Sequence, residues 1–248
     1  MAEKPNYGID APTVIRNLLI AAAACVVLPL AFPKVTIAHV TFMLNPGLFY
    51  GAVWMTAPAV AMLIYSKAGK FRHRDRILAK VQWTGAETVL DVGAGRGLLL
   101  IAAAKKLTTG HATGIDIWSN VDLSGNSPEA VLKNIVLEGV ESKASVKSED
   151  ARKMSFPEAS FDVIVSNACL HNVHPRAGRV QACREIARVL KPGGIAVISD
   201  FSAYAGLRGG ILEGGPDRGA ATTRLDRNLS AAADARGAQA RVRATRSR

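Results

Sequence analysis

The stretch from Thr88 to Gly97 reads TVLDVGAGRG and decides the fold of this chain. Its first half, Thr88 to Val92, is a short apolar run that is typical of a buried parallel strand. The glycine turn GAGRG follows at Gly93 to Gly97, and LLLIAAAKKL after it predicts an apolar helix. A strand, a glycine turn and a helix in this order are typical of nucleotide-binding α/β sheets.

Strands and helices alternate along the sequence that follows. We expect strands at 111–117, 144–151, 161–168 and 195–201, and helices at 127–140 and 176–190. Ser127 is the expected N-cap of the first of these helices, with Pro128 in its first turn, and LKPGG is the expected turn before the last strand. The pattern predicts an α/β domain over residues 87–201 with a Rossmann-like, doubly wound, mostly parallel sheet.

Acidic residues close two of the expected strands. Asp116 ends HATGID, and Asp150 follows ASVKSE. Because the carboxyl ends of parallel strands meet at one edge of a sheet, both should lie near the glycine turn. There Asp116 can accept hydrogen bonds from both hydroxyls of a ribose. Asp150 can accept one from the exocyclic amine of adenine, while the amide of Ala151 donates to the ring.

Asp91 separates two classes of adenosine ligand. A dinucleotide pyrophosphate prefers free helix N-terminal amides without a negative charge beside them. In this chain the glycine turn directly follows the carboxylate of Asp91, which would repel a diphosphate and attract a cation. The residues therefore favour the positively charged sulfonium compound S-adenosylmethionine over a nicotinamide dinucleotide.

Five motifs resemble the class I S-adenosylmethionine-dependent methyltransferases. They are VLDVGAGRG, GIDIW, SEDARKMSF, FDVIVSNACLHNV and LKPGG, in this order between about Lys80 and Phe201. The resemblance implies S-adenosylmethionine as the cofactor. It assigns Asp91, Gly93, Gly95 and Gly97 to the methionine end, Ala94 to the same turn, Asp116 to the ribose, Ile117 and Trp118 to the adenine face, Asp150 with Ala151 to the adenine edge, and Asn167 to the loop beside the methyl group.

The segment after the fourth expected strand bears on the acceptor. His171 and His174 are candidate general bases by position and by their near-neutral titration; alternatively, both are exposed loop histidines. Asn167 is followed by Ala-Cys-Leu and not by the Pro-Pro-aromatic run of methyltransferases that act on amino groups of DNA bases or protein glutamine. The LHNV run looks more like small-molecule and lipid-quinone methyltransferases, which implies a small-molecule or lipid-like acceptor.

Residues 1–66 carry two apolar segments, at about 14–32 and 48–65. Each is close to the roughly 20 residues that cross a bilayer core. A signal peptide is less favoured, because Arg16 lies inside the first segment and a second apolar segment follows. We expect a two-helix membrane hairpin, with buried helices of a soluble cap as the alternative.

The net charge of +11 is unevenly distributed. A basic run from Lys67 to Lys80 lies in residues 67–86, which we expect to form a linker helix that contacts anionic lipid headgroups or presents a solvated face. Because the loop between the apolar segments carries only Lys34, the positive-inside rule predicts that both termini and the catalytic domain lie in the cytoplasm. The central domain is nearly balanced in charge, so a nucleic-acid partner is not expected.

Cys25, Cys169 and Cys183 are too scattered for a zinc site or a disulfide framework, and no metal is expected.

Residues 202–248 form an atypical tail. From Gly206 onward it is rich in Gly, Ala and Arg and lacks aromatic residues. Class I methyltransferases usually continue with a helix and an antiparallel strand pair, which this composition does not predict. We hypothesise that the native ending was lost through a shifted reading frame; the alternative is a genuine Arg-rich tail. A lost strand pair would leave a rival function, a membrane-anchored nucleoside-binding protein with impaired catalysis.

Overall fold

The computed structural model describes residues 3–37, 39–43, 45–200, 221–222 and 241–242. These residues divide into two compact units. One unit holds residues 3–7, 73–118 and the described residues from 126 onward; the other holds 8–72 and 119–125. The loop 119–125 is thus grouped with the N-terminal unit, although it lies inside the predicted catalytic domain in sequence.

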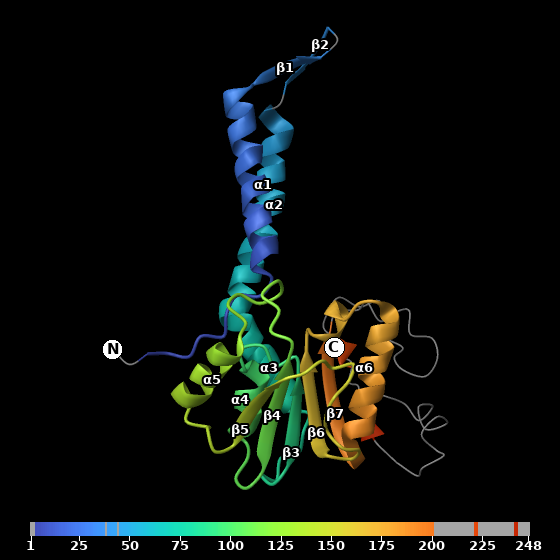
Figure 1. Ribbon diagram of the computed structural model, residues 1–248. Coiled ribbons are helices and arrows are strands. Elements are labelled where there is room, and N and C mark those ends of the chain that lie inside the picture. Colours follow the sequence, from blue (N-terminus) through green and yellow to red (C-terminus); the bar gives the residue numbers. More distant parts are fainter. Residues whose placement is uncertain (1–2, 38, 44, 201–220, 223–240, 243–248) are drawn as a thin grey trace. The chain divides into compact units, whose positions relative to one another are not determined.

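The first unit is built on a parallel sheet of five strands (Figure 1). The strands are β3 (Thr88–Val92), β4 (His111–Asp116), β5 (Ala144–Ser148), β6 (Phe161–Asn167) and β7 (Leu190–Asp200), in the spatial order β5-β4-β3-β6-β7. The chain order reverses direction between β3 and β6, which is the switch point where ligands bind in doubly wound sheets. The predicted fold class is confirmed.

β7 starts earlier than the sequence predicts. The strand begins at Leu190, whereas LKPGG was expected to be a turn before a strand at Ile195. Leu190 pairs with Phe161 of β6 and Ile195 pairs with Val163, so the intervening residues form a bulge in one continuous strand. Gly193 has φ 79°, a left-handed conformation that glycine adopts without strain.

Three helices pack against this sheet. They are α4 (Leu98–Ala104), α5 (Pro128–Leu137) and α6 (Arg176–Val189). The hydroxyl of Ser127 accepts a hydrogen bond from the Ala130 amide at 3.2 Å, which confirms the predicted N-cap of α5. Leu90, Ile164 and Ile186 belong to a fully buried cluster between the strands and α6. This core fixes the carboxyl ends of β3 and β6.

Two short strands lie beside β7. Ala221–Thr222 (β8) pairs antiparallel with its carboxyl end, and Arg241–Val242 (β9) pairs parallel near its middle. Each of these strands has two residues. The rest of the tail predicted at residues 202–248 lies outside the described residues. The hypothesis that a shifted reading frame produced this tail therefore stays a prediction.

The second unit contains a helical hairpin. It consists of α1 (Pro12–Ala31), the antiparallel strands β1 (Lys34–Ile37) and β2 (Val40–Met43), and α2 (Asn45–Ile64); a π-helical turn (Tyr65–Gly69) then leads into α3 (Lys70–Leu78). α1 and α2 approach closely where Gly51 faces Cys25, because a Cβ at Gly51 would lie 3.2 Å from the Cys25 Sγ. The two helices lie side by side in Figure 1.

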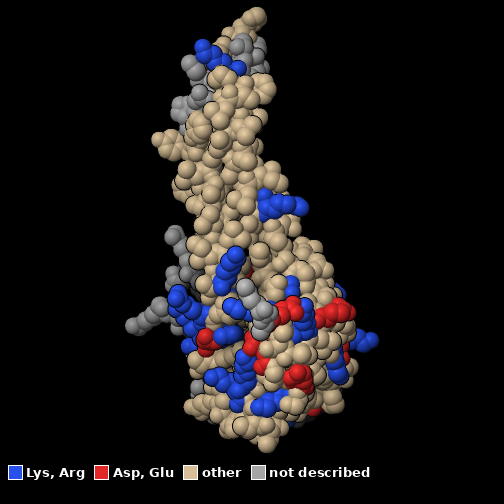
Figure 2. All heavy atoms as spheres, turned by 90° about the vertical axis from the view of Figure 1, so that its left-hand side faces the viewer, with Lys and Arg blue, Asp and Glu red and all other residues tan. Residues whose placement is uncertain are grey.

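The apolar side chains of this hairpin are largely exposed. Both helices are long and apolar enough to cross a membrane, and 17% and 11% of their apolar windows are buried. Trp54, Val53 and Ile20 are 75%, 66% and 61% exposed. On the face that Figure 2 shows, the hairpin carries few basic residues and no acidic ones. The described residues therefore leave most of this apolar surface uncovered.

One lysine of the predicted basic linker is buried. Lys70 is 4% exposed, and its Nζ donates to the Gly8 carbonyl at 2.7 Å and lies 3.5 Å from the Asp10 carboxylate. The Ser66 hydroxyl accepts the Asp10 amide at 3.0 Å. Lys70 thus ties the segment before α1 to the end of the hairpin, and the expectation that the whole basic run faces lipid or solvent is wrong at this position. Sequence alone gives no sign that a lysine in such a run is paired internally.

Candidate functional site at the carboxyl edge of the sheet

The glycine turn after β3 is held against β4. The amides of Gly93 and Ala94 both donate to the Ile115 carbonyl, at 2.9 and 3.0 Å. Gly93, Gly95 and Gly97 have φ values of 77°, 53° and 85°, in the left-handed region that favours glycine. A Cβ at Gly93 would lie 2.3 Å from the Cys169 Sγ. Position 93 therefore requires glycine for both conformation and space.

Asp91 lies beneath this turn and is 1% exposed. Its Oδ2 accepts the Leu100 amide at 2.8 Å, while its Oδ1 has no hydrogen-bond partner among the described residues. Burial raises the pKa of Asp91 to about 7, against the effect of the Leu100 hydrogen bond and with a smaller contribution from Asp116. A buried carboxylate oxygen without a partner favours an incoming cationic or hydrogen-donating group, because such a group restores the lost solvation.

Asp116 joins the glycine turn to the end of β4. Its Oδ2 accepts the Gly95 amide at 2.8 Å, and its Oδ1 accepts the Trp118 amide at 2.6 Å and the Asn126 side-chain amide at 3.3 Å. A carboxylate has about four acceptor positions, so these three bonds leave capacity for a ribose hydroxyl. The bonds also fix the orientation of the carboxylate.

Ile117 and Trp118 directly follow β4. Ile117 is 68% exposed, and Trp118 has φ 62°, an uncommon value for a residue with a side chain. The Trp118 Nε1 donates to the Ser148 Oγ at 2.7 Å, which directs the indole toward the end of β5. This hydrogen bond restrains the orientation of the ring.

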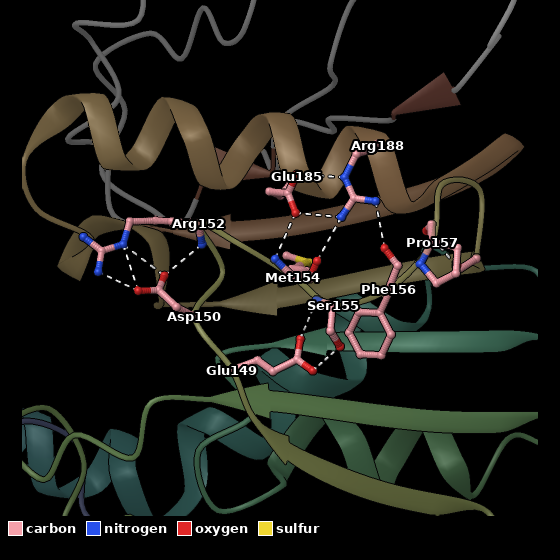
Figure 3. A network of polar contacts seen from close by, with 10 residues as sticks. Glu149, Asp150, Arg152, Met154, Ser155, Phe156, Pro157, Glu185 and Arg188 are labelled. Atoms are coloured by element: carbon pink, nitrogen blue, oxygen red, sulfur yellow. Dashed lines mark hydrogen bonds and ion pairs between the residues drawn. The ribbon is translucent and has the colours of Figure 1, made fainter.

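Asp150 is bound by Arg152, a partner that the sequence analysis did not assign (Figure 3). The Arg152 Nε lies 3.0 and 2.9 Å from the two Asp150 oxygens, and the Arg152 amide donates to Oδ1 at 2.8 Å. The Arg152 guanidinium lowers the pKa of Asp150 and keeps this half-buried group ionised. The neighbouring Ala151 is buried.

A second ion pair supports the loop that continues from Ala151 (Figure 3). Arg188 of α6 is paired with Glu185, and it donates to the carbonyls of Met154 and Phe156 at 3.1 and 2.7 Å. Glu185 accepts the Met154 amide at 2.9 Å. α6 thereby fixes the backbone next to the predicted adenine edge.

Asn167 ends β6 and contacts a residue that sequence reasoning missed. The Nε2 of His73, on α3, lies 3.1 Å from the Asn167 Oδ1 and 2.8 Å from the Ser199 Oγ. Ser199 is the residue of β7 that pairs with Asn167. No sequence signal points to His73, because it lies within the basic run and far from every motif.

The two candidate bases differ in their surroundings. The His171 Nδ1 lies 2.6 Å from Oδ1 of Asp200, and the His171 amide donates to Oδ2 at 3.2 Å. Asp200 is 3% exposed and ends β7. His174 is exposed, and its carbonyl accepts from Arg152 at 3.4 Å. Asp200 was also missed, although an acid at the carboxyl end of a parallel strand was a readable signal.

The predicted site residues thus gather at one edge of the sheet. Asp91, Asp116 and Asn167 lie in β3, β4 and β6, and Asp150 follows β5. No three His, Cys, Asp or Glu side chains of the described residues are grouped as metal ligands.

The comparisons with known proteins agree with this arrangement. Residues 90–198 match a family described as "Methyltransferase domain". They form a class I methyltransferase domain. Class I methyltransferases use S-adenosylmethionine, which is therefore the cofactor of this domain.

Two curated relatives are named for the compounds they methylate. The 2-methyl-6-phytyl-1,4-hydroquinone methyltransferase of Synechocystis is 34% identical over 52% of this chain and 38% of its own length. A demethylmenaquinone methyltransferase of Staphylococcus aureus is 32% identical over 52% of this chain and 49% of its own length. This chain thus spans half or less of these relatives. A solved methyltransferase structure from Methanosarcina mazei is 30% identical over 51% of this chain and 57% of its own, with a TM-score of 0.43.

The residues at the sheet edge fit S-adenosylmethionine. The partnerless Oδ1 of Asp91 lies where a positively charged methionine end would supply the missing partner. Three of the five residues of the turn are glycines without side chains, and a Cβ at Gly97 would lie 2.9 Å from the Val131 side chain. Asp116 retains acceptor capacity for the ribose. The fit favours the cofactor-binding roles predicted for these residues, which stay predictions until tested.

Proposed function

We propose that this chain transfers a methyl group from S-adenosylmethionine to a small-molecule or lipid-like acceptor at a membrane. The observation that carries the proposal is an exposed apolar hairpin in the same chain as a methyltransferase domain. Apolar side chains exposed along two helices of 20 residues need a non-aqueous surrounding. A bilayer supplies that surrounding, and it also holds apolar acceptors at high local concentration.

The lengths of the helices suit a bilayer. At 1.5 Å per residue a 20-residue helix is about 30 Å long, which matches the hydrocarbon core. Lysine and arginine are concentrated after α2, while the connection between the helices carries Lys34 alone. By the positive-inside rule both termini and the methyltransferase domain lie on the cytoplasmic side.

The acceptor would be activated by His171. S-adenosylmethionine, when bound, would supply an electrophilic methyl group for an acceptor oxygen or carbon. Asp200 holds the His171 Nδ1–H and leaves the lone pair on Nε2, where the imidazole takes up the acceptor proton. The buried carboxylate then stabilises the imidazolium that forms. A hydroquinone, the kind of compound in the name of the Synechocystis relative, has hydroxyl protons of suitable acidity.

A second function is favoured by one observation. The outer edge of β7 pairs, within the described parts of the chain, with two-residue strands only. If only these short strands cover the outer edge of β7, one side of an acceptor pocket would stay open to solvent. The second candidate is therefore a membrane-anchored protein that binds the nucleoside without transferring its methyl group.

A transfer assay separates the two functions. The full-length protein is reconstituted in phospholipid vesicles containing bacterial lipid extract, and S-adenosylmethionine with a tritiated methyl group is added. The proposal predicts tritium in the organic phase, and none with Asp116→Ala as the matched control. Saturable cofactor binding without tritium in any acceptor would support the second candidate, and the absence of both would contradict each.

A further inference from the structure

His73 contacts the site from outside the matched domain. It lies on α3, whereas the family match begins at residue 90. Its Nε2 lies 2.8 Å from the Ser199 Oγ and 3.1 Å from the Asn167 Oδ1. Asn167 and Ser199 pair directly across β6 and β7 at their carboxyl ends. Three polar side chains from three distant segments therefore meet at the edge where the cofactor site is formed.

The chemistry of this cluster defines which atom donates. The Asn167 carboxamide oxygen only accepts hydrogen bonds, so the proton of a neutral His73 ring lies on Nε2. Burial lowers the pKa of His73, with a further small effect of Arg76 and an opposing effect of the Asn167 hydrogen bond. The neutral ring with Nε2–H is the form that matches both contacts. It orients the carboxamide and the hydroxyl at once.

The cluster is costly to bury. Ser199 is 1% exposed, and His73 and Asn167 are half-buried. Apolar side chains of similar size would fill the space without desolvating three polar groups. The next residue, Ala168, has φ 51°, a strained value for a residue with a Cβ, and its amide donates to the Ser199 carbonyl at 2.8 Å. Polar burial together with backbone strain is typical of functional positions.

We propose that His73 is a positioning residue for methyl transfer, which fixes the Asn167 carboxamide and the Ser199 hydroxyl beside the methyl group of the cofactor. The inference rests on the proposed function through the place of Asn167 next to that methyl group. The helix that follows the apolar hairpin thereby completes the methyl-transfer site, and the matched residues 90–198 alone are not the whole site.

The test uses the full-length protein in detergent micelles. S-adenosylmethionine labelled with carbon-13 in its methyl group is bound to wild type, His73→Leu and His73→Gln. The methyl resonance of the bound cofactor is recorded, and the affinities for S-adenosylmethionine and S-adenosylhomocysteine are measured by calorimetry. His73→Leu should shift the resonance and change the ratio of the two affinities by about 2- to 10-fold, as expected for lost hydrogen bonds. His73→Gln should stay near wild type, because its amide can donate from a similar position.

A second histidine provides a matched control. His111 begins β4 and lies 2.8 Å from the Ser145 Oγ, a similar contact at the opposite edge of the sheet. His111→Leu should leave the methyl resonance unchanged. If His73→Leu does not fold, Ser199→Ala removes one contact of the cluster and should shift the resonance in a smaller degree.

The outcomes distinguish the two levels of inference. Wild type without a bound methyl signal would overturn the proposed function. Wild type with a signal that His73→Leu, or Ser199→Ala in its place, leaves unchanged would overturn only the positioning role of His73. A shift that His111→Leu reproduces would also overturn it, because the effect would then not depend on the carboxyl edge.

Discussion

Asp91 combines a full loss of solvent with a free acceptor oxygen, and this makes its protonation sensitive to the cofactor. Without the cofactor its pKa is about 7, because burial outweighs the hydrogen bond from Leu100. A cation bound at Oδ1 favours the ionised form and lowers that pKa. Binding of the cofactor and release of the Asp91 proton are therefore coupled.

This coupling predicts how affinity depends on pH. Calorimetry with S-adenosylmethionine should show affinity that rises from pH 6 toward pH 8, since an increasing share of Asp91 is already ionised. Asp91→Asn keeps the size of the side chain and should bind more weakly, with a flatter pH profile. Subtracting the pH profile of Asp91→Asn from that of wild type removes the contribution of ionisable groups on the ligand itself. Equal slopes for both proteins would contradict this role of Asp91.

The same pKa has a consequence for stability without cofactor. The ordinary pKa of 3.8 in the unfolded chain is lower than the folded value of about 7, so the folded state retains a proton that the unfolded state releases. The free energy of unfolding therefore falls by up to roughly 4 kcal/mol as the pH rises from about 4 to 7. Above pH 7 this contribution is constant. Asp91→Asn should unfold at a higher temperature than wild type above pH 7. A lower unfolding temperature of the variant at that pH would show that the carboxylate is stabilised in the fold.

Substitutions at His171 and Asp200 are predicted to change the rate of methyl transfer rather than the binding of the cofactor. His171→Gln should slow methyl transfer by about 100-fold or more, within the range of general base catalysis. Asp200→Asn should also slow it, because the ring loses its fixed tautomer. His174→Gln is the matched control and should transfer at nearly the wild-type rate. Initial rates in the vesicle assay, at saturating cofactor, measure all three; an unaffected rate in His171→Gln would exclude this base.

At the scale of elements, the strands and helices of the methyltransferase domain were predictable because each has its own local pattern. The apolar run of β3, the glycine turn and the N-cap Ser127 are read directly from adjacent residues. The bulge of β7 was not predictable, since KPGG is equally typical of a turn and its pairing depends on β6. Likewise, His73 and Lys70 lie in a run of basic residues, and their burial follows from contacts with distant segments.

The apolar hairpin gives a prediction at the same scale. Val53 lies near the middle of α2 and is 66% exposed. A charged residue in the centre of a membrane helix costs about 2.5–3.5 kcal/mol. Val53→Asp should therefore reduce the fraction of protein that floats with phospholipid vesicles in a density gradient, whereas Val53→Leu should float like wild type. Equal flotation of Val53→Asp would mean that α2 does not lie in the bilayer core.

At the scale of the whole molecule, the chain joins an apolar hairpin to a methyltransferase domain. The loop between β4 and α5 lies within the methyltransferase domain in sequence, but its residues 119–125 are grouped with the hairpin. The loop follows the predicted adenine face at Trp118 and is grouped with the hairpin unit. Within that unit the Ser124 hydroxyl accepts a hydrogen bond from the Ile9 amide at 2.8 Å, and the Asp122 backbone carbonyl accepts one from the Ala11 amide at 2.7 Å. These contacts join residues more than a hundred positions apart, so no local pattern indicates them. The charge balance, by contrast, was readable: lysines, arginines and acids are intermixed on the face shown in Figure 2.

The most direct measurement is cofactor choice by the intact protein. Wild type in detergent micelles is titrated at pH 7.5 with S-adenosylmethionine and, separately, with oxidised and reduced nicotinamide adenine dinucleotide. The carboxylate beneath the glycine turn predicts saturable uptake of the sulfonium compound and none of either dinucleotide. Uptake of a dinucleotide without uptake of S-adenosylmethionine would contradict the assignment of the site.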